Sequence, residues 1–346
     1  MLAQEEPLIT IRSMAPLRIS FAGGGTDVEP YVSECGGVVL NATISRYAYG
    51  SLRQRNDRKV TINSLDYRVQ TEYSLDENAP ADGQLELVKS ALARLNQGNL
   101  DTGFDIFLHT DAPPGSGLGA SSSLVVALIA LFRDWRNLPL TPYQMAELAY
   151  SIERIDFRIK GGRQDQYAAT FGGFNFMEFS KSNAIVNSLR ISDAALHELQ
   201  HNLLLCYTGT TRLSANIIDT QVAGYVSRNE DVLSAMDAMK DLTQQMKNAL
   251  LRGELATFGG LLHEAWATKK RFAAQISNSS IDEIYEVARK AGALGGKITG
   301  AGGGGHMFFY CPFQKRHLIA EALERIGCHE TKFTFDGLGV RTWRTQ

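Results

Sequence analysis

Residues 113–123 read PPGSGLGASSS, a glycine-rich stretch that runs directly into the apolar segment 124–135. This segment is too long for a strand and is apolar on nearly every side, so it predicts a buried helix. A P-loop would place Gly-Lys-Ser or Gly-Lys-Thr where the helix begins, but here the glycines are followed by Ala120 and three serines. The stretch therefore has the pattern of a phosphate loop without its lysine.

Such a loop can bind phosphate without a side-chain cation. A glycine turn that leads into a helix presents unpaired N–H groups at the positive end of the helix dipole. Three glycines allow the backbone to approach phosphate closely, and Ser121, Ser122 and Ser123 offer hydroxyls. Mg²⁺, which prefers oxygen ligands, could supply the remaining charge. Taken alone, the loop is equally compatible with a sharp turn, capped by serines, that holds no ligand.

Two further glycine clusters favour a ligand site. In APLRISFAGGGTD (residues 15–27) an expected strand carrying Arg18 ends in three glycines and Asp27. In KITGAGGGGHMFFY (residues 297–310) five glycines precede a strongly apolar strand. Each cluster could be a simple turn, but turns alone explain three such loops poorly.

Composition narrows the class of partner. The chain has 346 residues, of which 44% are hydrophobic, and this length predicts two domains. With 35 basic and 37 acidic residues, the chain lacks the excess of positive charge that binds nucleic acid or an anionic membrane. This balance favours a small-molecule partner. No apolar run is long enough to span a bilayer, and MLAQEEPLIT lacks the pattern of a secretory signal, so we expect a cytoplasmic protein.

The cysteines and histidines do not indicate a metal centre. Cys35, Cys206, Cys311 and Cys328 are far apart and form no C-x-x-C pair, so we expect reduced, mostly buried thiols. The seven histidines show no H-x-x-x-H cluster. His306, beside the third glycine cluster, is expected to be packed and not catalytic.

Periodicity predicts strands and helices that segregate along the chain. This arrangement favours an α+β architecture in two layers, not a doubly wound sheet. Helices are expected from a cap at Asp82 to just before Gly98, from Thr141 to about 157, and over 228–252, 254–272, 280–291 and 318–326. Strands, mostly antiparallel in the first half, are expected at 16–22, 36–44, 47–52, 59–64, 67–73, 104–110, 203–207, 306–310, 331–335 and 339–343.

The order and separation of the three glycine motifs resemble those of the GHMP kinases, a family that includes galactokinase, homoserine kinase, mevalonate kinase and phosphomevalonate kinase. The resemblance implies an N-terminal domain over 1–195 with a small-ribosomal-subunit-like α/β fold and a C-terminal ferredoxin-like domain over 196–346. It also implies a site for ATP and Mg²⁺ between them. The ATP-binding residues that it implies are Pro114, Gly115, Ser116, Gly117, Leu118, Gly119, Ala120, Ser121 and Ser122.

The stretch IERIDFRIKGGRQDQ contains two carboxylates at the separation that this family uses for its metal ligand and its base. By resemblance, Glu153 with Ser121 binds Mg²⁺, and Asp165 accepts the proton of the sugar hydroxyl. From the residues alone, Glu153 could be an exposed helix carboxylate paired with Arg154 or Arg158. Asp165 could equally be a helix N-cap.

The first motif supplies a cation and a sugar-binding segment. By resemblance Arg18 lies near the base and the reacting oxygen, where it would keep Asp165 ionised. A buried structural ion pair is the simpler alternative. Asp27 could bind sugar hydroxyls or cap the next turn, and the sequence alone supports both equally. The residues expected to bind substrate are Gly24, Gly25, Thr26, Asp27, Asp165, Arg212, Gly302 and Gly303.

Within the family, the first motif together with GGRQDQYAATFGGFN and YTGTTRLSA most resembles bacterial kinases of D-glycero-D-manno-heptose 7-phosphate. Such an enzyme phosphorylates the anomeric hydroxyl to give the 1,7-bisphosphate used in nucleotide-heptose synthesis for surface polysaccharide. L-fucose or galactose 1-kinases remain alternatives, although GGGTD departs from galactokinase at this motif. A non-catalytic sugar and ATP sensor is the alternative of another class, but intact Arg18, Glu153 and Asp165 argue against it.

A sugar phosphate substrate requires a second anion site away from ATP. We expect at least one basic side chain near the loops to line the sugar pocket. The expected partners are the sugar phosphate and ATP, and a homodimer is compatible with the sequence. The candidates for the second anion site are Arg212, Lys160, Arg163, Lys269, Lys270 and Arg271.

Overall fold

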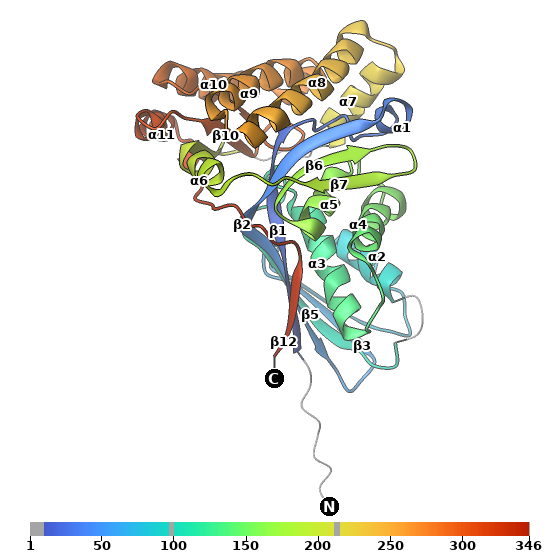
Figure 1. Ribbon diagram of the computed structural model, residues 1–346. Helices are drawn as coiled ribbons and strands as arrows, with labels where there is room; N and C mark the ends of the chain where they lie inside the picture. Colours follow the sequence, from blue (N-terminus) through green and yellow to red (C-terminus); the bar gives the residue numbers. More distant parts are fainter. Residues whose placement is uncertain (1–9, 97–99, 211–214, 346) are drawn as a thin grey trace, which may run out of the picture.

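The computed structural model describes residues 10–96, 100–210 and 215–345. Within these ranges the chain forms two separate β-sheets, each covered by its own helices (Figure 1). The predicted α+β architecture in two layers is therefore confirmed. No helix in the described ranges is both long and apolar enough to cross a membrane.

The larger sheet contains eight strands, in the order β12-β1-β2-β5-β3-β4, with β6 paired to β2 and β7 paired to β6. Only β3 and β5 pair in parallel; the other pairs are antiparallel, as expected. The two runs predicted at 36–44 and 47–52 form one long strand. The strands are β1 (Thr10–Ala22), β2 (Gly37–Gln54), β3 (Lys59–Ser64), β4 (Val69–Ser74), β5 (Phe104–Thr110), β6 (Phe174–Phe179), β7 (Ala184–Ser188) and β12 (Arg341–Thr345).

The apolar segment after the second glycine motif is a helix, α3 (Ala120–Trp135), as predicted. It packs against β1 and β2, and residues 125–132 are buried on every side of the helix. Figure 1 shows the neighbouring helices grouped beside the same sheet. They are α2 (Glu86–Leu95), α4 (Pro142–Tyr150) and α5 (Gln164–Phe171), while the short α1 (Tyr31–Cys35) follows β1.

The smaller sheet is antiparallel, in the order β11-β8-β10-β9. Helices predicted over 228–252, 254–272, 280–291 and 318–326 are all present, to within a few residues at their ends. The strands are β8 (Leu203–Tyr207), β9 (Gly295–Ile298), β10 (His306–Tyr310) and β11 (His329–Glu330). The helices of this half are α6 (Asp193–Asn202), α7 (Ala215–Val226), α8 (Glu230–Arg252), α9 (Leu255–Lys270), α10 (Ser279–Ala291) and α11 (Arg316–Glu324).

Two predicted features are wrong. Asp82 does not cap α2, because its carboxylate accepts a hydrogen bond from the buried Lys89 ammonium at 2.5 Å and the helix begins four residues later. Residues 331–335 do not form a strand. Their main-chain bonds go first to Leu205 in the small sheet and then to Ser45 in the large sheet, so this segment crosses between the sheets and follows neither.

The predicted helix from Thr141 changes type part-way. Thr141 caps α4 as expected, with its hydroxyl accepting from the Gln144 N–H in a capping box. From Ser151 to Asp156 the chain continues as a π-helix, a rare form that is frequent at functional sites. Helices α1, α5, α6 and α7 were not predicted as elements.

The two halves share one apolar core. The ring of Phe21, at the end of β1, lies 5.4 Å from that of Phe258 in α9 and 5.6 Å from that of Phe308 in β10. All three side chains are fully buried in the same cluster. This contact fixes the end of β1, where the first glycine motif begins, against the second half of the chain.

Candidate active site

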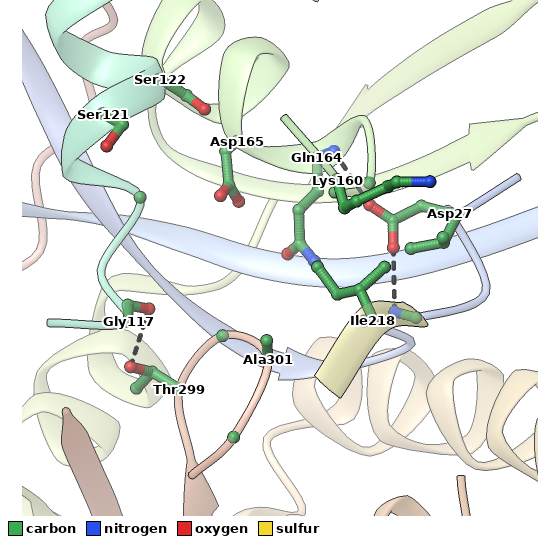
Figure 2. A pocket seen from close by; sticks show the side chains of 18 of the residues that line it. Asp27, Gly117, Ser121, Ser122, Lys160, Gln164, Asp165, Ile218, Thr299 and Ala301 are labelled. Atoms are coloured by element: carbon green, nitrogen blue, oxygen red, sulfur yellow. Dashed lines mark hydrogen bonds between the residues drawn. The ribbon is translucent and has the colours of Figure 1, made fainter. Parts of the chain in front are cut away.

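The three glycine motifs meet at one cavity, as their sequence pattern predicts. It is lined by the first glycine loop (residues 23–25), the second (113–119) and the third (299–305). Figure 2 shows side chains from both halves of the chain pointing toward this space. The other lining residues that carry charge or hydrogen-bonding groups include Arg18, Asp27, Ser121, Ser122, Glu153, Arg154, Lys160, Gln164, Asp165, Gln221 and Lys269.

Most of the predicted site residues that the structure describes line this cavity, but four of them do not. Leu118 and Thr26 are fully buried, and the Thr26 hydroxyl hydrogen-bonds to the Gly23 and Val38 carbonyls. Pro114 and Gly303 belong to the second and third loops but do not line the cavity wall. Arg212 lies outside the described residues.

Three glycines of the second loop adopt left-handed backbone conformations. Gly115, Gly117 and Gly119 all have φ between 76° and 78°, which side chains rarely adopt. Helix α3 begins directly after Gly119, so its first N–H groups lack intrahelical partners at the positive end of the helix. The loop can therefore receive an anion on main-chain donors alone.

The third glycine loop is fastened against the second. Thr299 donates from its hydroxyl to the Gly117 carbonyl at 2.9 Å, and the His306 N–H donates to the Ser116 carbonyl at 3.0 Å. A β-carbon on Gly117 would lie 2.7 Å from the Thr299 carbonyl oxygen, so this approach requires glycine. The backbone of one half of the chain thus supports the loop of the other.

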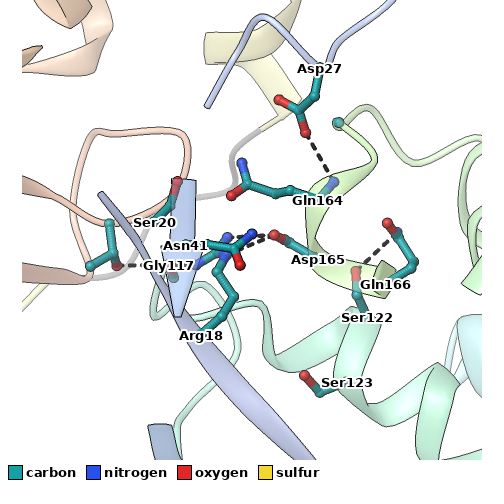
Figure 3. Close-up of polar contacts among 12 residues, drawn as sticks. Arg18, Ser20, Asp27, Asn41, Gly117, Ser122, Ser123, Gln164, Asp165 and Gln166 are labelled. Carbon is teal, nitrogen blue, oxygen red and sulfur yellow. Dashed lines mark hydrogen bonds and ion pairs between the residues drawn. The ribbon is translucent and has the colours of Figure 1, made fainter. Parts of the chain in front are cut away.

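An ion pair joins two of the predicted catalytic residues. Arg18 Nε and Nη2 each lie 2.8 Å from Asp165 Oδ1, and Nη1 donates to the Gly117 carbonyl (Figure 3). The Arg18 side chain is only 4% exposed, whereas Asp165 is 21% exposed and faces the cavity. The Asp165 carboxyl group is therefore held beside the second glycine loop by a buried guanidinium.

Asp165 lies in the first turn of α5 but is not its N-cap. The cap is supplied from elsewhere: Asp27 Oδ2 accepts from the Arg163 and Gln164 N–H groups at 2.9 and 3.0 Å (Figure 3). Asp27 Oδ1 also accepts from the Gly25 N–H. Asp27 therefore joins the first glycine loop to the helix that carries Asp165. A sugar contact for Asp27 stays a prediction.

The buried carboxylate Glu153 lies behind the start of α3. It comes from the π-helix and accepts a hydrogen bond from the Ser122 hydroxyl at 2.7 Å and another from the Gln166 amide. Burial raises the pKa of Glu153 above its ordinary value, although these contacts and the nearby Arg154 oppose the change. Ser122, not Ser121, is the serine in contact with Glu153, and Gln166 was not predicted as part of the site.

The oxygen donors at this point fit a small hard cation. Ser121, Ser122 and Glu153 line the cavity together at the start of α3. No cluster of three or more histidine, cysteine or acidic side chains suited to a metal occurs in the described ranges. Magnesium commonly takes only one or two carboxylates and completes its shell with waters and substrate phosphates. These three residues would hold such an ion only together with a nucleotide.

The predicted basic residues divide into two groups. Lys160 and Lys269 line the cavity. Arg163 pairs with Glu29, Lys270 with Asp282, and Arg271 with Asp231, and none of these three lines the cavity. Of these candidates Lys160 and Lys269 therefore line the cavity, and a place for either of them in a sugar pocket stays a prediction.

Sequence reasoning did not single out several residues that shape the site. Gln164, Gln221 and Ile218 line the cavity, and Thr299 ties two of its loops together. Two of these lie within quoted motifs, GGRQDQ and KITG, and proximity in the sequence could have indicated them. Gln221 and Ile218 come from α7, which no motif marked. His306 is buried as expected, but it also donates from Nδ1 to the Ser116 carbonyl.

Comparison with known proteins identifies the family. The model of the GHMP kinases N terminal domain matches residues 86–173, and that of the GHMP kinases C terminal domain matches residues 246–329. The chain is also 43% identical over 338 residues to the D-glycero-alpha-D-manno-heptose 7-phosphate kinase of Campylobacter jejuni, covering 97% of this chain and 99% of that protein. The chain belongs to the GHMP kinase family. It is a sugar kinase, and kinases of this family use ATP.

Solved structures agree with this placement. A D-glycero-D-manno-heptose 1-phosphate kinase from Bacteroides thetaiotaomicron superimposes on this GHMP kinase with a TM-score of 0.82 at 35% identity, covering 97% of this chain and 99% of that one. The galactokinase of Lactococcus lactis, solved with galactose, gives a TM-score of 0.78 at 22% identity and supports the fold alone. The predicted GHMP kinase fold is thus confirmed. The domain boundary at residue 195 stays a prediction.

Proposed function

We propose that this GHMP kinase transfers the γ-phosphoryl group of ATP to the anomeric hydroxyl of D-glycero-D-manno-heptose 7-phosphate, giving the 1,7-bisphosphate. The observation that carries the proposal is the Arg18–Asp165 ion pair beside the second glycine loop. It places the Asp165 carboxyl group next to main-chain donors suited to phosphate. Identity of 43% to a heptose 7-phosphate kinase supports the choice of sugar.

The roles follow from the geometry of these groups. Asp165 accepts the proton from the anomeric hydroxyl as the new oxygen–phosphorus bond forms and the bond from the γ-phosphorus to the bridging oxygen breaks. Arg18 holds Asp165 in place, because its guanidinium contacts that carboxylate from a buried position. The N-terminus of α3 and the second glycine loop hold the transferred phosphate and the leaving diphosphate.

A divalent cation completes the charge balance. Ser121, Ser122 and Glu153 would hold Mg²⁺, which neutralises charge on the β- and γ-phosphates when it is bound. The protein itself supplies the position of these oxygen donors: Glu153 is fixed by Ser122 and Gln166.

A substrate screen tests the proposed function. Turnover is measured with heptose 7-phosphate, L-fucose, galactose and mevalonate under the same ATP concentration. We expect the highest kcat/KM with heptose 7-phosphate. A higher value with fucose or galactose would overturn the choice of sugar, and a protein that consumed ATP with none of them would be a sensor.

The base is tested by Asp165→Asn. Removing the proton acceptor should lower kcat about 10²- to 10⁴-fold, while ATP still binds to the second loop. Asp156→Asn is the matched control, because this exposed carboxylate lies in the same segment, 3.9 Å from Arg94, and does not line the cavity. Equal turnover by the Asp165→Asn variant and the wild type would contradict the assignment.

A further inference from the structure

A buried lysine faces the part of the cavity that the proposed mechanism does not use. Lys269, in the last turn of α9, is 4% exposed and lines the cavity beside the first glycine loop. Its ammonium donates to the Gly24 carbonyl at 2.7 Å and lies 4.7 Å from the centre of the Phe272 ring. Within the described ranges it makes no ion pair and no second hydrogen bond, so two of its three N–H donors are free for a ligand.

The charge of Lys269 is poorly compensated. Burial lowers the pKa of this ammonium to about 8, and the only opposing influence is Asp27. The Asp27 carboxylate is itself occupied, since it accepts from three main-chain N–H groups. Lys269 is a buried cation that forms no ion pair with any residue that the structure describes, which is costly unless a ligand supplies the missing charge.

A polar side chain from α7 lies beside this ammonium. Gln221 Nε2 donates to the Gly25 carbonyl at 2.9 Å. A β-carbon on Gly25 would lie 2.8 Å from Lys269 Nζ and 3.0 Å from Gln221 Oε1, so both groups approach the cavity at the same point. The absence of a side chain at Gly25 leaves this point open to a ligand.

Lys269 and the second glycine loop lie on different sides of Asp165. A β-carbon on Gly119, in the second loop, would lie 3.4 Å from Asp165 Cγ. On the other side, a β-carbon on Gly24 would lie 3.1 Å from Gln164 Nε2. The next residue, Gly25, adjoins Lys269. In Figure 2 Asp165 is seen between the serines of α3 and the side formed by Asp27 and Ile218.

We infer that Lys269, assisted by Gln221, binds the phosphate ester of the sugar substrate and makes this enzyme selective for a phosphorylated sugar. The inference rests on the proposed function and adds the residue that binds the 7-phosphate. In the pyranose form of heptose 7-phosphate the ring oxygen, ring carbon C5 and the two-carbon side chain separate the anomeric carbon from the phosphate ester. With the anomeric hydroxyl at Asp165, the phosphate extends along the first glycine loop toward Lys269. An ammonium-to-phosphate contact is a charge-assisted hydrogen bond.

Lys160, the other lysine on the cavity wall, fits this role less well. Its side chain is 59% exposed and its ammonium lies 3.5 Å from Asp219 on α7, so it already has an anion. An exposed pair of this kind contributes little to binding energy. Lys269 is buried and forms no ion pair in the described part of the chain.

The test compares two substrates that differ only in the phosphate. The discrimination ratio is kcat/KM with D-glycero-D-manno-heptose 7-phosphate divided by kcat/KM with D-glycero-D-manno-heptose. Lys269→Met should lower this ratio about 10- to 100-fold, mainly through KM for the phosphorylated sugar, with KM for ATP nearly unchanged. Lys270→Met is the matched control, because it removes the adjacent charge on the same helix, which pairs with Asp282 outside the cavity; its ratio should equal that of the wild type.

A second variant tests the same contact if Lys269→Met fails to fold. Gln221→Glu keeps the side-chain shape and places a carboxylate beside Lys269, where it would compete with the phosphate. It should lower the same ratio. An unchanged ratio in both variants, with the wild type active on heptose 7-phosphate, would overturn the role of Lys269 and leave the proposed function intact. A wild type inactive on heptose 7-phosphate would instead reject the proposed function itself.

Discussion

Arg18 serves three parts of the site at once. Its guanidinium contacts the Asp165 carboxylate and the Gly117 carbonyl, and its main-chain N–H donates to the Leu118 carbonyl. The two alternatives raised by the sequence, a structural ion pair and a catalytic pair, are therefore not exclusive. One side chain fixes the proposed base and holds the second glycine loop in place.

The cost of a buried carboxylate at Glu153 can be measured in the absence of nucleotide. The folded-state pKa of Glu153 is raised above 4.5 by burial, so the protonated form is favoured in the folded protein. Its stabilising contribution is present below pH of about 4.5 and is lost as the pH rises through the raised value. Glu153→Gln removes this dependence, because the amide stays neutral.

We therefore expect Glu153→Gln to raise the Tm of the nucleotide-free protein by roughly 2 °C or more at pH 8, and by less at pH 5. The same variant should lose most of its Mg²⁺-dependent turnover. Scanning calorimetry at the two pH values measures the first effect. Glu147→Gln, an exposed carboxylate on the preceding helix, is the control and should show no such difference. Equal shifts at pH 5 and pH 8 would contradict the interpretation.

At the level of elements, the second and third glycine loops act as one unit. Hydrogen bonds from Thr299 and His306 hold the second loop from the opposite half of the chain. Two features require glycine at position 117. Its φ is 78°, and a β-carbon there would lie only 2.7 Å from the Thr299 carbonyl oxygen. The approach of the two loops, more than the flexibility of either, shapes the proposed anion site.

Gly117→Ala tests this contact. We expect a loss of stability above the ~1 kcal/mol that a positive φ alone costs, and a several-fold rise in KM for ATP. Gly83→Ala separates the two effects, because Gly83 also has a φ of 78° but a β-carbon there would meet nothing within 4 Å. Urea unfolding and ATP kinetics of the two variants provide the comparison. Similar losses in both would show that the contact with Thr299 is unimportant.

The sequence predicted elements well where one local pattern decides the structure. The apolar period of α3, the capping box at Thr141 and the long amphipathic helices of the second half are local features. The cap predicted at Asp82 was wrong because its carboxylate binds the buried ammonium of Lys89 instead of the first N–H groups of the helix. The π-helix at Glu153 has no local signature, since it meets partners on α3 and α5.

The site was predictable for a similar reason. The sequence motifs are recognisable from their clustered glycines, and they contain Arg18, Asp165 and the three glycine loops. Lys269 was only one of several basic candidates, and nothing local distinguishes it from Lys270. Burial decides between the two, and burial depends on how α9 packs against the first glycine loop.

Across the whole molecule, the two halves are joined by more than the active site. The last strand, β12, returns to pair with β1 in the first sheet, and Arg344 contacts Asp134 at the end of α3. Phe21 contributes to the core of the second half through Phe258 and Phe308. A site assembled from both halves depends on these contacts, because the glycine loops come from each side.

This shared core predicts that the two halves unfold together. Trp135 at the end of α3 reports on the first half and Trp266 in α9 on the second. With Trp343→Phe and one further Trp→Phe change, each tryptophan can be followed alone by fluorescence in urea. The two midpoints should coincide.

Phe21→Ala should then lower the free energy of unfolding by about 3–5 kcal/mol, because it opens a cavity between the halves. Phe107→Ala, which removes a ring that is 43% exposed on β5, should cost far less. Separate midpoints for Trp135 and Trp266, or equal costs for the two phenylalanine variants, would mean that the halves are stable independently and that the glycine loops meet without a common core to hold them.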